Sequence, residues 1–449
     1  MTSRKLPLIE APAAASRQKP WATRADGASV RRLPVLESVR EIDRNTRPIY
    51  AVWEVTLRCD LACKHCGSRA GKGRPDELDT AEALGLVDQL ADLGVREVSL
   101  IGGEVYLRDD WERIAARVAE RGMVCGIVTG GRGFDRARAA AAKAAGVEGV
   151  SVSVDGLEET HDNLRAARGS HRAALEALGH LAAVGLKRSA NTQINRWNLR
   201  EIPDVLESLI PTGIAAWQVQ FTVAMARAAD NGAMLLEPYQ LIEAMPMVAR
   251  LKARADEAGV HLWSGNNVGY FGPFERQLYE RTQAGHHLSC GAGNSGIGIE
   301  ANGDIKGCPS LPTADYVGGN IRDFSLREIW EQTAPLRFTR DRSTDELWGF
   351  CKSCYYAEDC MAGCSWTAHV LLGRRGNNPY CHHRTLELLK LGKRERITQV
   401  ERAPGHPFDY GRFELVEEIW QTDERERAER VARGEERWLI DETAATLPR

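Results

Sequence analysis

Short apolar stretches alternate with amphipathic helical stretches between residues 50 and 221. The apolar stretches predict six strands, at Tyr50–Thr56, Glu97–Ile101, Val124–Val128, Val150–Val154, Ser189–Ile194 and Trp217–Phe221. Helical spacing predicts the connections, at Thr80–Gly94 with Thr80 as N-cap, Asp110–Arg121, Asp135–Ala145, His171–Val184 and Leu199–Leu209. Alternating strands and helices imply a parallel sheet with right-handed crossovers. The predicted fold class is α/β, and six units are too few for a closed eight-stranded barrel, so a partial (β/α)6 TIM-like barrel is expected.

Three cysteines follow the first predicted strand, namely Cys59, Cys63 and Cys66 in the run VTLRCDLACKHC. Ligands bind at the carboxyl ends of parallel strands, so this loop lies at the end of the sheet where a site is expected. Three thiolates can hold three irons of a four-iron cubane cluster and leave the fourth open to a substrate or cofactor. The alternatives are a disulfide pair or a zinc knuckle, although structural zinc takes four ligands and only His65 is near enough to be a local fourth.

Composition changes this picture little. The chain has 449 residues, enough for two or three domains. Its eleven cysteines are odd in number and too sparse for a disulfide scaffold, which indicates a reducing, cytoplasmic setting. The net charge of -3 gives no sign of nucleic-acid binding. No apolar stretch predicts a membrane-spanning helix, and the N-terminus has no secretory signal.

The run CDLACKHC, followed by IGGE after the second predicted strand, resembles the radical SAM superfamily. The resemblance implies that the cluster's open iron binds the amino and carboxylate groups of S-adenosylmethionine. It also implies that Gly102, Gly103 and Glu104 contact the methionyl amine. Glycines let the backbone come close, and Glu104 offers an acceptor to an ammonium group.

Further cofactor contacts follow from the same resemblance. The stretch SVDGLEETHDNLRAARGS resembles the family's fourth-strand region, which makes Ser153 and Asp155 expected polar contacts. Arg165 is the candidate for binding the cofactor's carboxylate. Arg168 could take that role instead, and solvated surface arginines are the alternative for both. Asn195, in NTQIN, is a further candidate at a strand end.

A second series of cysteines lies in the C-terminal half. Its members, with Gly303 between the first two, are Cys290, Cys308, Cys351, Cys354, Cys360, Cys364 and Cys381. The series resembles the SPASM extension of radical SAM enzymes, which implies two auxiliary iron–sulfur clusters of the 4Fe-4S type. The stretch GIEANGDIKGCPSLP predicts a short β-hairpin with an Asn-Gly turn. Zinc ribbons are the alternative, but seven ligands divide badly into four-coordinate sites.

The resemblance also divides these cysteines between the two clusters. The outer cluster would take Cys351, Cys354, Cys360 and Cys381, and the inner cluster Cys290, Cys308 and Cys364. The inner cluster is then one cysteine short. His286 or His287 could complete it, a carboxylate could, or an iron could stay open to substrate. Cys125 lies within a predicted strand and is expected to be a buried structural thiol.

These patterns divide the chain into four parts. We expect a flexible N-terminal arm at 1–48, a radical SAM core at 49–265, a SPASM domain with a hairpin and helices at 266–385, and a charged, partly helical tail at 386–449. In the tail, Phe413–Arg433 predicts a charged helix with Leu415, Ile419 and Trp420 on one side.

The resemblance implies an oxidoreductase that generates a 5′-deoxyadenosyl radical and modifies, by crosslinking, a ribosomally made precursor peptide (RiPP maturation). The implied partners are the precursor peptide, a ferredoxin or flavodoxin-like reductant and a separate leader-binding protein. Pro309 directly after Cys308 counts against the sulfatase-maturing branch, which tends to have Asp there. The alternatives are a radical SAM enzyme acting on a small molecule such as a tetrapyrrole in cofactor biosynthesis and, last, a non-enzymatic iron–sulfur protein.

Overall fold

A ten-stranded sheet forms the centre of the protein. The computed structural model describes residues 4–5, 21–23, 29–31, 39–279 and 289–439. The strand order is β10-β9-β8-β7-β6-β5-β4-β11-β12-β13. Six parallel strands form the predicted partial barrel, namely β4 (Tyr50–Glu54), β5 (Glu97–Ile101), β6 (Val124–Thr129), β7 (Val147–Ser153), β8 (Lys187–Ile194) and β9 (Ala216–Phe221). The α/β partial barrel predicted from the sequence is therefore confirmed.

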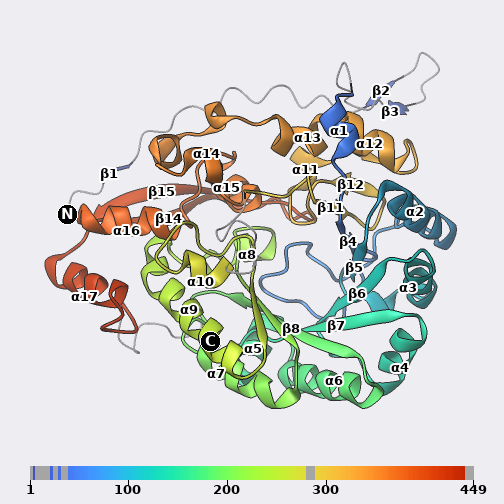
Figure 1. Cartoon of the computed structure of the whole chain (residues 1–449), viewed down its shortest axis with the longest axis horizontal. Coiled ribbons are helices and arrows are strands. Elements are labelled where there is room, and N and C mark those ends of the chain that lie inside the picture. The colour runs from blue at the N-terminus through green and yellow to red at the C-terminus, as the bar shows by residue number, and fades with distance from the viewer. Residues whose placement is uncertain (1–3, 6–20, 24–28, 32–38, 280–288, 440–449) are drawn as a thin grey trace.

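Helices connect these strands and cover the outside of the sheet (Figure 1). They are α2 (Thr80–Leu93), α3 (Trp111–Glu120), α4 (Arg136–Ala144), α5 (Glu158–Arg165), α6 (Ser170–Val184) and α7 (Ile202–Leu209). Their apolar faces and the strands share one core, in which Trp53, Leu86, Leu90, Ile114 and Trp217 are completely buried. The amphipathic periodicity of the sequence thus corresponds to the buried faces of these helices.

The start of α2 differs from the expectation. Asp79, not Thr80, is the N-cap, and Thr80 is the first helical residue. The Asp79 carboxylate accepts the Glu82 N–H at 2.8 Å, and the Glu82 carboxylate accepts the Asp79 N–H at 2.8 Å. This reciprocal capping box satisfies two amides and so favours the earlier start. Gly94 ends the helix in the left-handed region, as predicted.

The sheet continues beyond the six predicted strands on both sides. After α8 (Arg227–Asp230) and α9 (Leu241–Glu257), β10 (His261–Ser264) adds a parallel strand beside β9, which the sequence analysis missed. On the other side, β11 (Gly296–Ile299) pairs in parallel with β4. The strands β11 and β12 (Asp304–Lys306) form the predicted Asn-Gly hairpin, and β13 (Gly319–Asn320) follows it. The cysteine-rich region is therefore attached to the barrel by strand pairing.

Between β10 and the C-terminal hairpin, the described residues include seven short helices. They are α10 (Glu275–Tyr279), α11 (Thr313–Tyr316), α12 (Leu326–Gln332), α13 (Ala334–Asp341), α14 (Ala357–Cys360), α15 (Ser365–Leu372) and α16 (His382–Lys390). In Figure 1 the helices α11 to α15 lie beyond β11 and β12, on one side of the sheet. Within the described residues, no helix combines the length and apolar character of a membrane-spanning segment.

The prediction of one helix over Phe413–Arg433 is wrong for its first half. Residues Arg412–Ile419 form β15, which pairs antiparallel with β14 (Lys393–Glu401), and only α17 (Thr422–Ala432) is helical. Leu415 and Ile419 are four residues apart, a spacing that fits a helical face, but both lie in the strand and Ile419 is 58% exposed. Trp420 is buried and its ring contacts Tyr239 edge to face, which fixes the hairpin to the barrel.

Part of the predicted N-terminal arm is held by ion pairs. Its described strands are β1 (Arg4–Lys5), β2 (Trp21–Thr23) and β3 (Ser29–Arg31), and the remainder up to residue 38 lies outside the described residues. Helix α1 (Glu41–Asn45) carries Asp43, which is completely buried. Asp43 lies 3.1 Å from the Arg337 guanidinium and 3.4 Å from that of Arg340. These contacts join residues 40–45 to α13.

We predict that Glu395→Ala destabilises the fold by about 3–5 kcal/mol, because it leaves the Arg384 guanidinium buried without its anion. The two side chains are 3% and 6% exposed and form a two-bonded pair, with 2.7 Å and 2.6 Å between nitrogen and oxygen. Urea unfolding followed by circular dichroism measures the change. Glu418→Ala breaks a less deeply buried pair with Arg394, whose side chain is 15% exposed and keeps Glu424 as a second partner, and is the control, expected to cost less than about 1 kcal/mol. Equal effects of the two substitutions would contradict the prediction.

Candidate active site

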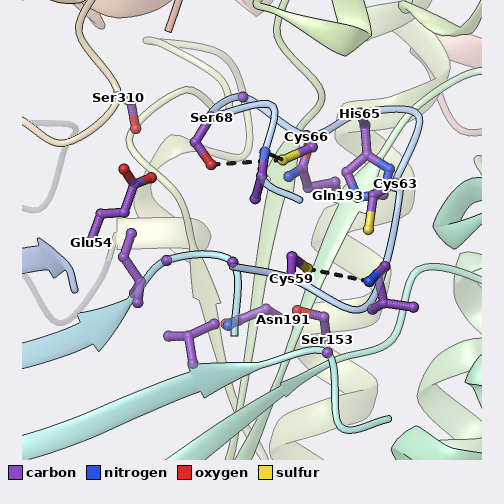
Figure 2. A pocket seen from close by; sticks show the side chains of 18 of the residues that line it. Glu54, Cys59, Cys63, His65, Cys66, Ser68, Ser153, Asn191, Gln193 and Ser310 are labelled. Atoms are coloured by element: carbon purple, nitrogen blue, oxygen red, sulfur yellow. Dashed lines mark hydrogen bonds between the residues drawn. The ribbon is translucent and has the colours of Figure 1, made fainter. Parts of the chain in front are cut away.

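The cysteine loop and the carboxyl ends of the barrel strands enclose one cavity of about 290 Å³. Cys59, Cys63 and Cys66 line it (Figure 2). Backbone amides point at two of the sulfurs, since Leu61 N lies 3.4 Å from Cys59 Sγ and Ala70 N 3.4 Å from Cys66 Sγ. Burial raises the pKa of the Cys59 thiol to about 12 and the Leu61 amide opposes that rise, so the amide favours the thiolate, the form in which cysteine binds a metal. The predicted cluster cysteines therefore share one cavity in a setting that suits iron ligation.

The three thiols lie around one cavity, as the ligands of a cluster would. Among the described residues, no three His, Cys, Asp or Glu side chains converge as a mononuclear metal site requires. In a cubane cluster each thiolate binds a different iron, so the sulfurs stand around the cluster and do not meet at one point. All eleven cysteines are free thiols.

The loop after β5 lies directly against the cysteine loop. Gly103 N–H donates to the Thr56 carbonyl at 2.8 Å, and Glu104 N–H donates to the Arg58 carbonyl at 2.8 Å. A Cβ on Gly102 would lie 2.3 Å from the Thr56 oxygen, and one on Gly103 2.0 Å from the Arg58 oxygen. Gly102 also has a φ of 151°. Only glycine permits this approach, which explains why both positions lack a side chain.

Glu104 is held rigidly in the cavity wall. One oxygen accepts the Thr129 hydroxyl at 2.5 Å and the other accepts the Gly130 N–H at 2.6 Å. Burial raises the pKa of Glu104 to about 7, and these two hydrogen bonds oppose that rise. A cation in the cavity would restore the carboxylate form. Glu104 is therefore a fixed, buried acceptor suited to an ammonium group.

Asp155, Arg165 and His65 form a buried charged group beside Cys63. The Arg165 guanidinium lies 2.5 Å from Asp155 Oδ2, and His65 Nε2 lies 3.2 Å from the same oxygen. Arg165 also donates to Cys63 Sγ at 3.6 Å. Burial alone would raise the pKa of Asp155, but Arg165 and His65 lower it below its ordinary value. Asp155 is thus a carboxylate that orients Arg165 toward the cluster loop.

Of the other predicted cofactor contacts, only some line this cavity. Ser153, at the end of β7, lines the cavity. Arg168 lines a second cavity on the other side of the cysteine loop, with Arg132 and Arg227. Asn195 is outside the residues that line either cavity. Its side chain donates to the Thr222 hydroxyl and accepts the Trp197 N–H, so it stabilises the turn after β8.

Several cavity residues were missed by the sequence analysis. The polar ones include Glu54, Ser68, Thr129, Asn191, Gln193, Gln220 and Ser310, and the apolar ones include Val223, Met225, Trp366 and Phe408. Asn191 and Gln193 alternate along β8 toward its carboxyl end. Strand periodicity at the ligand-binding edge could have found them. The residues from 309 onward come from distant segments, and no local signal marks them.

The later cysteines gather in two places. Cys290 and Cys308 share a small apolar cluster with Leu311. Burial and the nearby thiols of Cys290 and Cys308 raise the pKa of Cys364, so Cys364 belongs to the same group. A separate pocket is lined by Cys351, Cys354, Cys360 and Cys381. This is the grouping that the resemblance predicts for an inner and an outer cluster. His286 and His287, the candidates for a further inner ligand, lie outside the described residues. Cys125 is completely buried in β6.

Comparison with known proteins supports these assignments at the level of family and fold. The family descriptions "Radical SAM superfamily" and "Iron-sulfur cluster-binding domain" (SPASM) match residues 53–209 and 290–355. An AdoMet-dependent heme synthase of Methanosarcina barkeri is 30% identical over 75% of this chain and 97% of its own length. A PqqA peptide cyclase of Ruegeria pomeroyi is 28% identical over 76% of this chain and 91% of its own.

A solved structure has a similar fold. The S-adenosylmethionine-bound form of SuiB from Streptococcus suis aligns with a TM-score of 0.57 and 17% sequence identity, over 75% of this chain and 76% of that one.

We predict that Gly103→Ala lowers the iron content of the purified protein, because the new Cβ displaces the Arg58 carbonyl and with it the cysteine loop. Gly85→Ala is the matched control. Gly85 lies in α2 with open space around its Cα, so alanine there is expected to keep the iron and to stabilise the helix by about 0.5–1 kcal/mol. Iron per chain, measured by atomic emission, tests both. Wild-type iron content in Gly103→Ala would refute the role of this close contact.

Proposed function

We propose a peptide-modifying activity on one premise: this chain belongs to the radical SAM superfamily and carries a SPASM iron–sulfur cluster-binding domain. It is therefore an enzyme, and a non-enzymatic iron–sulfur protein is set aside. The family's cofactors are S-adenosylmethionine and an iron–sulfur cluster. The activity proposed is oxidative modification, by crosslinking, of a ribosomally made precursor peptide.

We assign the cofactors to residues as follows. Cys59, Cys63 and Cys66 would hold the first cluster. Glu104 would accept the ammonium group of S-adenosylmethionine, and Arg165, oriented by Asp155, would bind its carboxylate. The bound pair supplies the 5′-deoxyadenosyl radical, and the protein's part is to orient the substrate and exclude water. Two auxiliary 4Fe-4S clusters would use the later cysteines, and a ferredoxin or flavodoxin-like protein would deliver the electron.

The side chains of the cavity wall favour a peptide as the substrate. Neutral hydrogen-bonding side chains that suit the N–H and C=O groups of a peptide line the cavity, among them Ser68, Asn191, Gln193, Gln220 and Ser310. Among the described lining residues, the one arginine or lysine is Arg165, which already pairs with Asp155. A tetrapyrrole brings several carboxylates, and these require cationic partners.

The size of the cavity supports the same choice. Ligand pockets of proteins measure roughly 300–1,000 Å³, and this one, at about 290 Å³, must also hold S-adenosylmethionine. An extended peptide can place one side chain there with its remainder outside. A tetrapyrrole would have to enter as a broad, rigid plate. The relatives named above include a PqqA peptide cyclase, whose name states a peptide substrate.

A tetrapyrrole-modifying activity is the second candidate, because relatives of equal similarity are called heme synthases. The two candidates differ in genomic context. A short precursor-peptide gene beside the coding gene favours the first, and tetrapyrrole biosynthesis genes favour the second. A separate leader-binding protein is the proposed third component of the peptide system.

We predict that Glu104→Gln weakens S-adenosylmethionine binding about 10- to 100-fold, because a charge-assisted hydrogen bond contributes about 1.5–3 kcal/mol. Since the pKa of Glu104 is raised to about 7, wild-type affinity should fall as the pH drops below 7, where the carboxyl is protonated. The variant should lack this dependence. Anaerobic equilibrium dialysis measures it, with exposed Glu112→Gln as control. Unchanged affinity in Glu104→Gln would rule the contact out.

We predict that the reconstituted, reduced enzyme removes two hydrogen atoms from a precursor peptide encoded by a neighbouring gene for each crosslink, forming 5′-deoxyadenosine in step. Anaerobic incubation followed by mass spectrometry of the peptide checks this. Cys59→Ala should form neither product, because the cluster loses a ligand. Conversion of a tetrapyrrole together with unchanged peptides would decide for the second candidate.

A further inference from the structure

Two buried carboxylates lie side by side where the barrel meets the SPASM region. Glu54 is the last residue of β4, and Glu300 directly follows β11. The preceding residues Trp53 and Ile299 are partners in the parallel register, so the two glutamates are neighbours across the strands. Glu54 is 2% exposed and Glu300 1% exposed. Two neighbouring buried carboxylates repel each other, so either each has a cation as partner or their pKa values differ and one of them stays protonated.

Glu300 has cationic partners on both oxygens. Its Oε1 lies 2.8 Å from Lys306 Nζ, and its Oε2 lies 2.8 Å from Arg74 Nη2. The Thr313 hydroxyl also donates to Oε1. Burial would raise the pKa of Glu300, but Lys306 and Arg74 lower it below its ordinary value. Glu300 is therefore a structural carboxylate with no capacity left for a substrate.

Glu54 is in the opposite state. Its Oε1 has no hydrogen-bond partner among the described residues, and its side chain lines the cavity. Burial and the neighbouring Glu300 raise the pKa of Glu54 to about 8, against the opposing effects of Arg74, Lys306 and the Ser68 hydroxyl. An unsatisfied buried oxygen is costly unless a ligand completes it. A carboxyl that titrates near the working pH can act as a proton acceptor.

The other two carboxylates of the cavity have roles of their own, and Glu104 is the proposed acceptor of the cofactor's ammonium group. Both oxygens of Glu104 accept hydrogen bonds, from Thr129 and Gly130. Asp155 is paired with Arg165 and His65. Figure 2 shows Glu54 on the side of the cavity near Ser310, apart from Cys63 and His65. Glu54 is thus the acid that faces a molecule standing between the first cluster's loop and the SPASM region.

We infer that Glu54 is a catalytic residue that contacts the substrate and accepts the proton released when the substrate is oxidised. The inference rests on the proposed function. In the crosslinking, the deoxyadenosyl radical takes one hydrogen atom from a substrate carbon, and the carbon radical bonds to a second substrate group. That group then loses its proton to the Glu54 carboxylate, and one electron passes to an oxidised SPASM iron–sulfur cluster. Two hydrogens leave the peptide, one as an atom and one as proton plus electron.

The test compares two variants. Glu54→Gln keeps the size of the side chain and removes the ionisable carboxyl group, and Glu54→Asp keeps the carboxyl group on a shorter side chain. Using the precursor peptide that the wild type converts, Glu54→Gln should form 5′-deoxyadenosine within about twofold of wild type but crosslink at least about 100-fold more slowly. Glu54→Asp should recover part of the rate. The wild-type crosslinking rate should rise with pH up to about 8, as Glu54 loses its proton, and Glu54→Gln should lack that rise.

Glu243→Gln is the matched control, since Glu243 is also buried and its pKa is raised by burial, but it lies outside the cavity. It should crosslink as wild type does. Crosslinking by Glu54→Gln at the wild-type rate overturns the inference while leaving the proposed function intact. Equal loss of 5′-deoxyadenosine in Glu54→Gln also overturns it, because the residue would then serve cofactor binding or folding.

A substrate-free measurement keeps the inference testable if no peptide is converted and the proposed function fails. Infrared difference spectra of the iron-loaded protein should contain a protonated-carboxyl component that disappears with a midpoint of about 8 and is missing in Glu54→Gln, whereas the Glu104 component, with a midpoint of about 7, should remain in that variant. The component that is missing in Glu54→Gln supports Glu54 as a titrating acid of the cavity. A Glu54 carboxyl that is already ionised at pH 7 overturns the inference whatever the substrate.

Discussion

The pairing of β4 on both edges is the constraint on which the site depends. The strand bonds in parallel to β5 on one side and to β11 on the other. Because parallel strands end at the same edge of a sheet, this pairing brings three loops together. They are the cysteine loop after β4, the Gly102–Glu104 loop after β5 and the segment around Glu300 after β11. A shift in either register would separate the groups that the proposed chemistry needs.

The three carboxylates of the cavity have different roles because each has different hydrogen-bonding and ionic partners. Glu104 receives two neutral hydrogen bonds and keeps its capacity for an ammonium group. Asp155 receives cations and stays ionised. Glu54 has an oxygen with no partner among the described residues, beside a second acid that has taken the nearby cations. Burial is common to all three, so the partners and not the depth decide the protonation state.

The sequence predicts well those features that depend on local periodicity and close spacing. The strands from β4 to β9, the Asn-Gly hairpin and the cysteine groups follow from patterns a few residues long. The errors have physical reasons. Asp79 competes with Thr80 for the same helix end, and the charged β15 is a strand only because β14 pairs with it. Glu54 could not be predicted, since its environment depends on Glu300, which is far away in the chain.

The attachment of the SPASM region by β11 also determines where a substrate can stand. The hairpin brings Pro309 and Ser310 into the cavity wall directly after Cys308, a proposed inner-cluster ligand. On the same side, Lys306 and Arg74 hold Glu300 and leave Glu54 facing inward. A substrate that reaches Glu54 therefore lies between the site of radical formation and the residues proposed to hold an electron acceptor. In the proposed reaction, the proton and the electron would then both leave the substrate on the side of the cavity that Glu54 and Ser310 line.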